Sequence, residues 1–291
     1  MSRIVLVGAD TLIGEEIGKN IDNISALYSS PGNTETILAE AGEGAALIQP
    51  LSLIEGESCD LLIDASSESI LKTKLKKRNF KTYLYAGPGP VPEGTIGTTG
   101  REDKNRAALY HLFHPALILM EEMLFISGGQ QPETLSVACY TGASFYGREE
   151  RDDLCRESSD ILEFGLEGSD HRAFNIKKKR GGRDFEEDVK TLYPGMANLL
   201  CWEMEAPFFH GMVLNLGAIW KRREDALSAS GRMKGLAKIA RREDNLFISV
   251  RNEEILISDF TQRGKGIKVT IFADEILNVI VPKVADFVKN Y

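Results

Sequence analysis

The chain has 291 residues, of which 43% are hydrophobic and 27% are charged, and its formal net charge at pH 7 is −8. These values are ordinary for a folded globular protein with one large core or two smaller ones. The negative charge argues against general binding to nucleic acid or to an anionic membrane. No signal-peptide pattern or membrane-length apolar run is present, and the four cysteines (Cys59, Cys139, Cys155 and Cys201) form no CxxC pair. We therefore expect a cytoplasmic protein without a metal site or disulfides.

The N-terminal stretch predicts a strand, a glycine turn and a helix. Residues 3–7 are apolar and β-branched, the turn runs from Gly8 to Gly14, and Ile13, Ile17 and Ile21 recur at four-residue spacing. This order is typical of the opening of a dinucleotide-binding βαβ unit, in which N–H groups at the helix N-terminus approach a pyrophosphate.

The candidate nucleotide-binding residues lie in this turn and after the second predicted strand, residues 24–28. They are Gly8, Thr11, Leu12, Ile13, Gly14, Ser29 and Ser30. Thr11 replaces the middle glycine of the motif, so we expect its side chain to stand where the phosphate should come closest. Serines replace the acidic residue that usually holds the ribose of NAD, which suits a 2′-phosphate or no nucleotide at all. A purely structural turn is the alternative.

Further strands and helices alternate through the first part of the chain. Strands are predicted at 60–64 and 82–85 with a basic helix at 70–77 between them, while 34–56 has no clear pattern. This alternation predicts a doubly wound parallel sheet, the Rossmann-like α/β class. A proline- and glycine-rich loop follows at 87–92, and His114-Pro115 opens an apolar helix at 116–126, with proline in its first turn. His114 is expected to be a helix cap.

The second part of the chain has longer and more widely spaced predicted strands. They lie at 134–143, 172–176, 207–221, 246–250, 254–257 and 267–272, with a charged helix at 147–165 and a broadly helical stretch at 186–204 that Pro194-Gly195 breaks. This pattern favours an α+β region with a mixed or mostly antiparallel sheet. Apolar residues 277, 280, 281, 284 and 288 predict a terminal amphipathic helix that returns to pack on the N-terminal region.

Four stretches, in the correct order, resemble the aspartate-semialdehyde dehydrogenase family. Tyr140-Thr141-Gly142-Ala143-Ser144-Phe145-Tyr146-Gly147 follows a strand as the family's Tyr-Gln-x-x-Ser-Gly-x-Gly pattern does, and Ala206-Pro207-Phe208-Phe209-His210-Gly211 is similar to its Val-Pro-Val-Phe-Tyr-Gly-His-Ser strand. Arg172-Ala173-Phe174-Asn175 matches an Ala-Phe-Asn segment. The stretch from Thr270 to Asn278 looks like the last strand and helix of the family.

The resemblance implies an NADP-binding Rossmann domain at residues 1–113 with 271–291. It also implies a dimerisation domain at 114–270, and therefore a homodimer. Lys190 matches a family lysine associated with phosphate binding, which implies a small anionic ligand. The family's glycine- and alanine-rich loop near the nicotinamide has no counterpart before Ile276, and together with Thr11 this weakens the expectation that NADP binds.

The family's chemistry requires a cysteine thiolate at a helix N-terminus, a glutamine, a histidine base and an arginine for the substrate carboxylate. No cysteine lies between Cys59 and Cys139. Thr141 occupies the glutamine position, and Glu203 lies where the arginine is expected. His210 is the candidate for the base. The sequence therefore predicts a family member without the nucleophile.

Two functions follow from this pattern. The first is a dimeric ligand-binding or scaffold protein that has lost dehydrogenase activity. The second is an active NAD(P)-dependent oxidoreductase with altered, non-covalent chemistry on an aldehyde or oxo group, in which His210 is the acid or base. The basic run at 177–183 is either a solvated loop or a site for an anionic ligand or an acidic partner.

Overall fold

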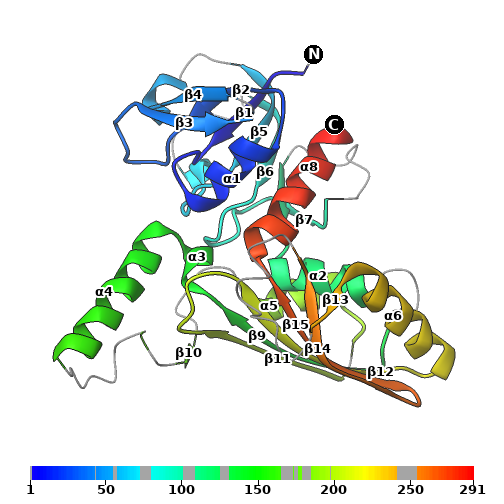
Figure 1. Cartoon of the computed structure of the whole chain (residues 1–291). Coiled ribbons are helices and arrows are strands. Elements are labelled where there is room, and N and C mark those ends of the chain that lie inside the picture. Colours follow the sequence, from blue (N-terminus) through cyan, green and yellow to red (C-terminus); the bar gives the residue numbers. More distant parts are fainter. Residues whose placement is uncertain are drawn as a thin grey trace.

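The computed structural model describes residues 2–42, 44–54, 58–72, 80–100, 109–124, 131–164, 173, 176–178, 185–196, 198–240 and 254–291. Two sheets form the framework, with helices packed between them (Figure 1). No helix in these ranges is long and apolar enough to cross a membrane.

The N-terminal sheet has eight strands in the order β3-β4-β2-β1-β5-β6-β8-β7. All neighbouring pairs are parallel except β3 with β4, so the sheet is Rossmann-like, as the sequence predicts. Its elements are β1 (Ile4–Val7), α1 (Leu12–Asn20), β2 (Ile24–Tyr28), β3 (Ile37–Ala41), β4 (Gly44–Gln49), η1 (Leu51–Ile54), β5 (Cys59–Asp64), η2 (Ile70–Lys72), β6 (Phe80–Tyr85), β7 (Ile96–Thr98) and β8 (Leu109–Leu112).

The second sheet has seven strands in the order β10-β11-β9-β12-β15-β14-β13 and is mixed, because β11 with β9 and β13 with β14 are parallel. Its strands are β9 (Thr134–Thr141), β10 (Lys177–Lys178), β11 (Asn198–Glu205), β12 (Met212–Ile219), β13 (Lys238–Ile239), β14 (Leu256–Arg263) and β15 (Gly266–Ala273). The associated helices are α2 (Pro115–Leu124), α3 (Ala143–Tyr146), α4 (Arg148–Phe164), α5 (Phe185–Leu192), α6 (Arg223–Leu236), the π-helix η5 (Glu275–Ile280) and α8 (Val281–Lys289).

One hydrophobic core joins both sheets through these helices. It includes Leu6 of β1, Leu117 of α2, Val137 of β9 and Phe287 of α8. The C-terminal helix returns to the N-terminal region as predicted: α8 packs against α1, and the Phe287 ring meets that of Tyr110 edge-on with centroids 5.4 Å apart. A buried ion pair between Lys283 and Glu122 also ties α8 to α2.

The stretch predicted to be broadly helical at 186–204 is only half helix. α5 ends at Leu192, and β11 begins at Asn198, beyond Pro194-Gly195. Burial then alternates from residue to residue along β11, which pairs with β9 on one side and β10 on the other. The helical prediction was wrong beyond the break, because strand pairing across the sheet overrode the local pattern.

Other boundaries also differ from the sequence expectation. The unassigned stretch at 34–56 contains the β3–β4 hairpin and η1, and the strand predicted from 207 begins only at Met212. Of the expected basic helix at 70–77, the described part is the short η2. Lys177 and Lys178 form β10 instead of a loop. The strand predicted at 246–250, most of that at 172–176, and the basic residues 179–183 lie outside the described residues.

Prediction for the β1–α1 turn. Gly8→Ala is expected to lower the free energy of unfolding by about 3 kcal/mol, because Gly8 has φ +75° and a Cβ there would lie 2.5 Å from the backbone N of Ser66. The matched control is Gly18→Ala within α1, where the nearest atom would be 3.8 Å away, and this change should stabilise the protein by about 0.5–1 kcal/mol. Urea unfolding of both variants measures the difference, and equal effects would contradict the close packing of this turn.

Candidate functional site

The β1–α1 turn is shaped by contacts within the protein. A Cβ at Gly14 would lie 1.9 Å from the Gly8 carbonyl oxygen, and one at Gly8 would collide with Ser66. Both glycines are therefore required by the close approach of the turn, the helix and the loop after β5. Their presence alone does not demonstrate a ligand.

Thr11 is the N-cap of α1. Its Oγ1 accepts a hydrogen bond from Gly14 N–H at 3.0 Å and lies 2.8 Å from the Gly8 carbonyl oxygen and 3.1 Å from that of Ala65. The hydroxyl therefore points toward the backbone of the β1–α1 turn. There it provides the Gly14 N–H with the acceptor that solvent or a ligand would otherwise provide. The N–H groups of Leu12 and Ile13 have no acceptor among the described residues and remain for a ligand.

A cavity of about 360 Å³ opens beside this turn. Thr11, Leu12, Ile13 and Ser30 line it, together with Asp10, Ala65, Ser67, Pro88, Ser144, Phe145, Tyr146, Gly147, Arg148, Glu149 and Glu150. Four of the seven predicted nucleotide-binding residues therefore line one cleft with α3 and the start of α4, whereas Gly8, Gly14 and Ser29 are not among its lining residues. Its mixed polar and apolar walls fit part of a nucleotide.

An acidic residue that was not among the predicted site residues lines this cleft beside the end of β2. Asp10 Oδ1 accepts hydrogen bonds from Ser30 N–H at 2.6 Å and from Ser30 Oγ at 2.7 Å, and its Oδ2 accepts one from Asn33 Nδ2 at 2.8 Å. Ser29 is fully buried, and its hydroxyl donates to the Asn33 carbonyl. Ser30 therefore reaches the cleft, whereas Ser29 supports the loop beneath it.

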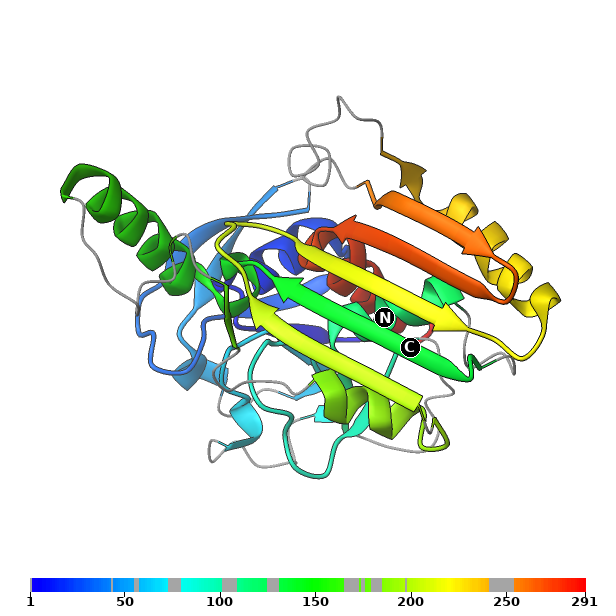
Figure 2. The same cartoon turned by 90° about the horizontal axis from the view of Figure 1, so that it is seen from below.

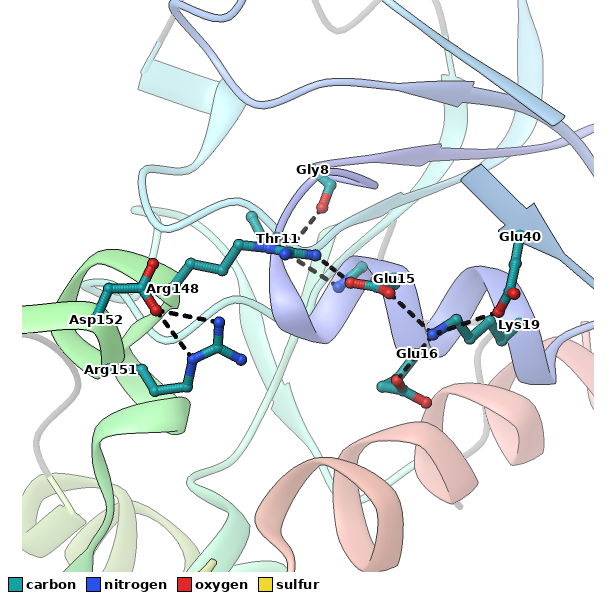
Figure 3. A network of polar contacts seen from close by, with 10 residues as sticks. Gly8, Thr11, Glu15, Glu16, Lys19, Glu40, Arg148, Arg151 and Asp152 are labelled. Atoms are coloured by element: carbon teal, nitrogen blue, oxygen red, sulfur yellow. Dashed lines mark hydrogen bonds and ion pairs between the residues drawn. The ribbon is translucent and has the colours of Figure 1, made fainter. Parts of the chain in front are cut away.

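The one basic side chain among the described residues that line this cleft is already in an ion pair. Arg148, the first residue of α4, contacts Glu15 on α1. Figure 3 shows how Lys19, Glu16 and Glu40 extend this pairing along the surface of α1. The network joins α4 to α1 and leaves the wall of the cleft with little positive charge to offer a phosphate.

Helix α2 is preceded by a buried histidine, His114. His114 Nδ1 accepts a hydrogen bond from Ala116 N–H at 3.2 Å, as expected for a helix cap, while the backbone N–H of His114 donates to Asp188 Oδ2 at 2.7 Å. Its Nε2 lies 3.2 Å from Glu203 Oε1, and the imidazole packs against the rings of Phe145 and Phe185. Its polar atoms are thus directed at protein partners.

Thr141 lies next to this histidine cluster at the end of β9. The Thr141 side chain is buried, and its Oγ1 lies 3.6 Å from the Cys139 sulfur. The hydroxyl of Tyr146 is also nearby. Burial, with the charges of Glu203 and Glu205 nearby, raises the pKa of Tyr146. The cavity beside Thr141 measures only about 10 Å³, so little space remains next to this side chain.

His210 belongs to the loop from Ala206 to Gly211. The carbonyls of Phe208, Phe209 and Gly211 accept the N–H groups of residues 143, 144 and 142 at 2.9–3.0 Å, so this loop caps α3. His210 is half-buried there and is absent from the lining of the 360 Å³ cleft. The structure therefore positions its backbone securely without bringing its side chain into that cleft.

Lys190 lies apart from the other candidate residues. Its side chain is 65% exposed on α5 and pairs with Glu186 at 2.6 Å. Lys190 lies near Cys201 on β11. Thr141 pairs with Glu205, which is four residues further along the same strand, so roughly 13 Å separates Cys201 from the level of Thr141. Burial raises the pKa of Cys201 to about 12, which suits an unreactive core thiol.

Glu275 is a fully buried carboxyl group behind the wall of the cleft. Its Oε1 accepts a hydrogen bond at 2.8 Å from Ser144 Oγ, a residue of the wall, and its Oε2 has no partner at hydrogen-bonding distance. Burial, reinforced by the neighbouring charge of Asp274, raises its pKa to about 8. Sequence reasoning missed this residue, because its burial depends on α3 and the π-helix packing together.

The described part of the chain contains no group of three His, Cys, Asp or Glu side chains arranged to hold a metal ion. No protein-family model matches the sequence, and no curated protein matches it.

The fold is that of two-sheet proteins with a Rossmann-like parallel sheet. Among solved structures, the chain is similar to a probable aspartate-semialdehyde dehydrogenase from Pseudomonas aeruginosa, with a TM-score of 0.78, 13% identity and coverage of 98% of this chain and 97% of the other. It is also similar to aspartate semialdehyde dehydrogenase II from Vibrio cholerae (TM-score 0.75, 14% identity, coverage 100% and 99%). A third similar structure is the aspartate semialdehyde dehydrogenase from Francisella tularensis, with a TM-score of 0.72, 9% identity and coverage of 99% of this chain and 100% of the other. These likenesses establish the fold.

Prediction for Glu275. The carboxyl group has a pKa of 4.5 when unfolded and about 8 when folded, so only the unfolded state loses its proton between these values. The contribution of Glu275 to stability is therefore fully present below pH 4.5 and is lost as the pH rises through 8. Relative to Glu275→Gln, the wild type should lose a few kcal/mol of unfolding free energy between pH 5 and pH 8.5.

Urea unfolding at several pH values measures this difference. The matched control is Glu163→Gln, at an exposed position on α4, which should retain the pH dependence of the wild type. An unchanged pH profile in Glu275→Gln would show that this carboxyl is not held protonated.

Proposed function

We propose that this protein is a dimeric ligand-binding relative of the aspartate-semialdehyde dehydrogenases that has lost the covalent dehydrogenase reaction. The observation that carries the proposal is the buried pairing of His114 with Glu203 at the N-terminus of α2, where a thiolate would be required. The 360 Å³ cleft beside α1 is the place where a ligand still fits.

The N-terminus of α2 is poorly suited to covalent chemistry. A helix N-terminus stabilises a thiolate through N–H groups that point at it. Here the Ala116 N–H is taken by His114, and the His114 N–H is taken by Asp188. Ala116 is itself fully buried, so an incoming aldehyde carbon would find neither a nucleophile nor space.

The surroundings of Glu203 also oppose the substrate named for the similar enzymes. A carboxylate substrate beside Glu203 and Glu205 would place like charges together in a poorly solvated site. Such repulsion typically costs a few kcal/mol where water is excluded. Loss of the nucleophile and loss of the carboxylate anchor thus point in the same direction.

The dimer is supported by the outer face of the second sheet. Met204, Tyr140, Val213 and Phe272 form an apolar row across β11, β9, β12 and β15, and Trp202 on the same face is 50% exposed. In Figure 2 the strands face the viewer, and the red C-terminal helix lies behind them. A second copy would cover this apolar face.

We also propose the division into a domain of residues 1–113 with 271–291 and a domain of residues 114–270. The packing of α8 on α1 and the contact of Phe287 with Tyr110 support the return of the C-terminus to the first domain.

The second candidate function is an NAD(P)-dependent oxidoreductase with non-covalent hydride transfer. The cleft favours this function, because Thr11 and Ile13 at the start of α1 and Tyr146 of α3 line a single space. NADP is the cofactor that the similar enzymes suggest. His210 would be the acid or base.

Prediction for activity. The purified protein, supplied with aspartate semialdehyde, phosphate and either NADP or NAD, should form no reduced cofactor above the rate of buffer alone. The physical reason is the missing thiolate, without which the thioacyl intermediate cannot form. Absorbance of the reduced nicotinamide measures the rate. Turnover that disappears in His210→Ala would establish the second candidate instead.

Prediction for assembly. Trp202→Asp should convert the dimer to a monomer at micromolar concentration, because a buried unpaired charge would replace an apolar contact. Sedimentation velocity measures the change. Leu53→Asp is the matched control, since Leu53 is similarly exposed but belongs to η1 of the N-terminal region, and it should remain dimeric. If the wild-type protein sedimented as a monomer at micromolar concentration, the proposed dimer would be wrong.

A further inference from the structure

The carboxylate of Asp10 lies at the carboxyl edge of the parallel sheet, beside the end of β2. It lines the 360 Å³ cleft, and Ser30 and Asn33 hold it in one orientation through three hydrogen bonds of 2.6–2.8 Å. The strand itself ends at Tyr28, and Ser29 follows it. The acidic group at this edge is therefore supplied by the β1–α1 turn, 20 residues earlier in the chain.

In Rossmann-type sheets this edge is where a nucleotide ribose binds. A carboxylate there accepts a hydrogen bond from the ribose 2′-hydroxyl, whereas a 2′-phosphate requires a cationic partner. A carboxylate can accept about four hydrogen bonds, and Asp10 uses three of them for Ser30 and Asn33. One acceptor position is left for a hydroxyl from the cleft.

We propose that Asp10 binds the 2′-hydroxyl of a ribose, so that the cleft accepts a nucleotide with an unphosphorylated ribose, such as NAD, and discriminates against NADP. This inference rests on the proposed ligand-binding function and names the class of ligand for the same cleft. The Leu12 and Ile13 N–H groups at the start of α1 are positioned for its phosphates.

The charges around the cleft support this preference. Its basic residue, Arg148, is paired with Glu15, and Glu149 and Glu150 add negative charge to the same wall. A phosphate dianion at about 5 Å from Asp10 would be repelled even with the screening of bulk water. Coulomb's law then gives at least about a tenfold loss of affinity for NADP relative to NAD.

The structure thereby changes the expectation from the sequence. Ser29, Ser30 and the absence of an acidic residue after β2 suited a 2′-phosphate. Ser30 instead donates both its N–H and its hydroxyl to Asp10, so these groups stabilise a carboxylate. The serine that suggested NADP thus belongs to an arrangement that favours a free ribose.

Calorimetric titration of the full-length protein with NAD and with NADP is the direct test. We expect saturable binding of NAD and at least tenfold weaker binding of NADP. ADP and 2′-deoxy-ADP form a second pair, in which loss of the 2′-hydroxyl should weaken binding about tenfold. Equal or tighter binding of NADP would overturn the proposal, as would absence of binding by NAD and ADP.

Two variants locate the preference at Asp10. Asp10→Asn removes the charge and should bring the affinities for NAD and NADP to within about threefold of each other. Glu163→Gln removes a charge from an exposed position on α4 that does not line the cleft, and it should keep the wild-type ratio. If Asp10→Asn proves unstable in thermal unfolding, the two wild-type ligand pairs still decide the matter. Dehydrogenase and sedimentation measurements test the proposed function separately. The proposed function and the preference for NAD can therefore fail independently of each other.

Discussion

The close approach of the β1–α1 turn to the loop after β5 is the constraint on which the rest of the N-terminal region depends. Gly8 leaves no room for a side chain against Ser66, and Ala65 N–H bonds to the Val7 carbonyl at 2.9 Å. The loop is fixed from behind by the fully buried Asp64, which accepts hydrogen bonds from Ser66, Tyr83 and the N–H of Ile70. Burial raises the pKa of Asp64, although these hydrogen bonds oppose the shift.

This constraint also creates the cleft. With Gly8 against Ser66 and the Thr11 hydroxyl directed at Ala65, the N-terminus of α1 has a fixed position. α3 and α4 then close the opposite wall, where Ser144 is held by Glu275 and Arg148 by Glu15. The same contacts that stabilise the fold therefore determine which polar groups face a ligand. The N-terminus of α2 differs, because the backbone N–H groups of His114 and Ala116 are already hydrogen-bonded to Asp188 and to the His114 imidazole.

Much of the fold could be predicted from local sequence signals. The βαβ opening and the terminal helix carry a strong periodicity, α2 is predominantly apolar, and each was found close to its expected place. β11 was mistaken for helix, because its exposed Leu200 and Trp202 obscure the alternation that strand pairing produces. The sequence pattern also gave no indication that the Thr11 hydroxyl caps α1 by accepting a hydrogen bond from the Gly14 N–H.

The candidate site was less predictable than the fold. Asp10 precedes Thr11 in a turn, and no rule of spacing from β2 would have identified it as the ribose-side carboxylate. Glu275 lies 131 residues from Ser144 in the sequence, so only their packing joins them. Sequence patterns report neighbours along a helix or strand, whereas these pairs arise between separate elements.

The sequence by itself determined the type of fold and the absence of any cysteine between Cys59 and Cys139, because periodicity and residue identity are local properties of the chain. Only the tertiary structure decided that Thr11 is a cap, that His114 pairs with Glu203, and that Ser30 serves a carboxylate. The physical reason is that the strength and direction of a polar interaction depend on burial and on the partner across space, neither of which is encoded at fixed spacing along the chain.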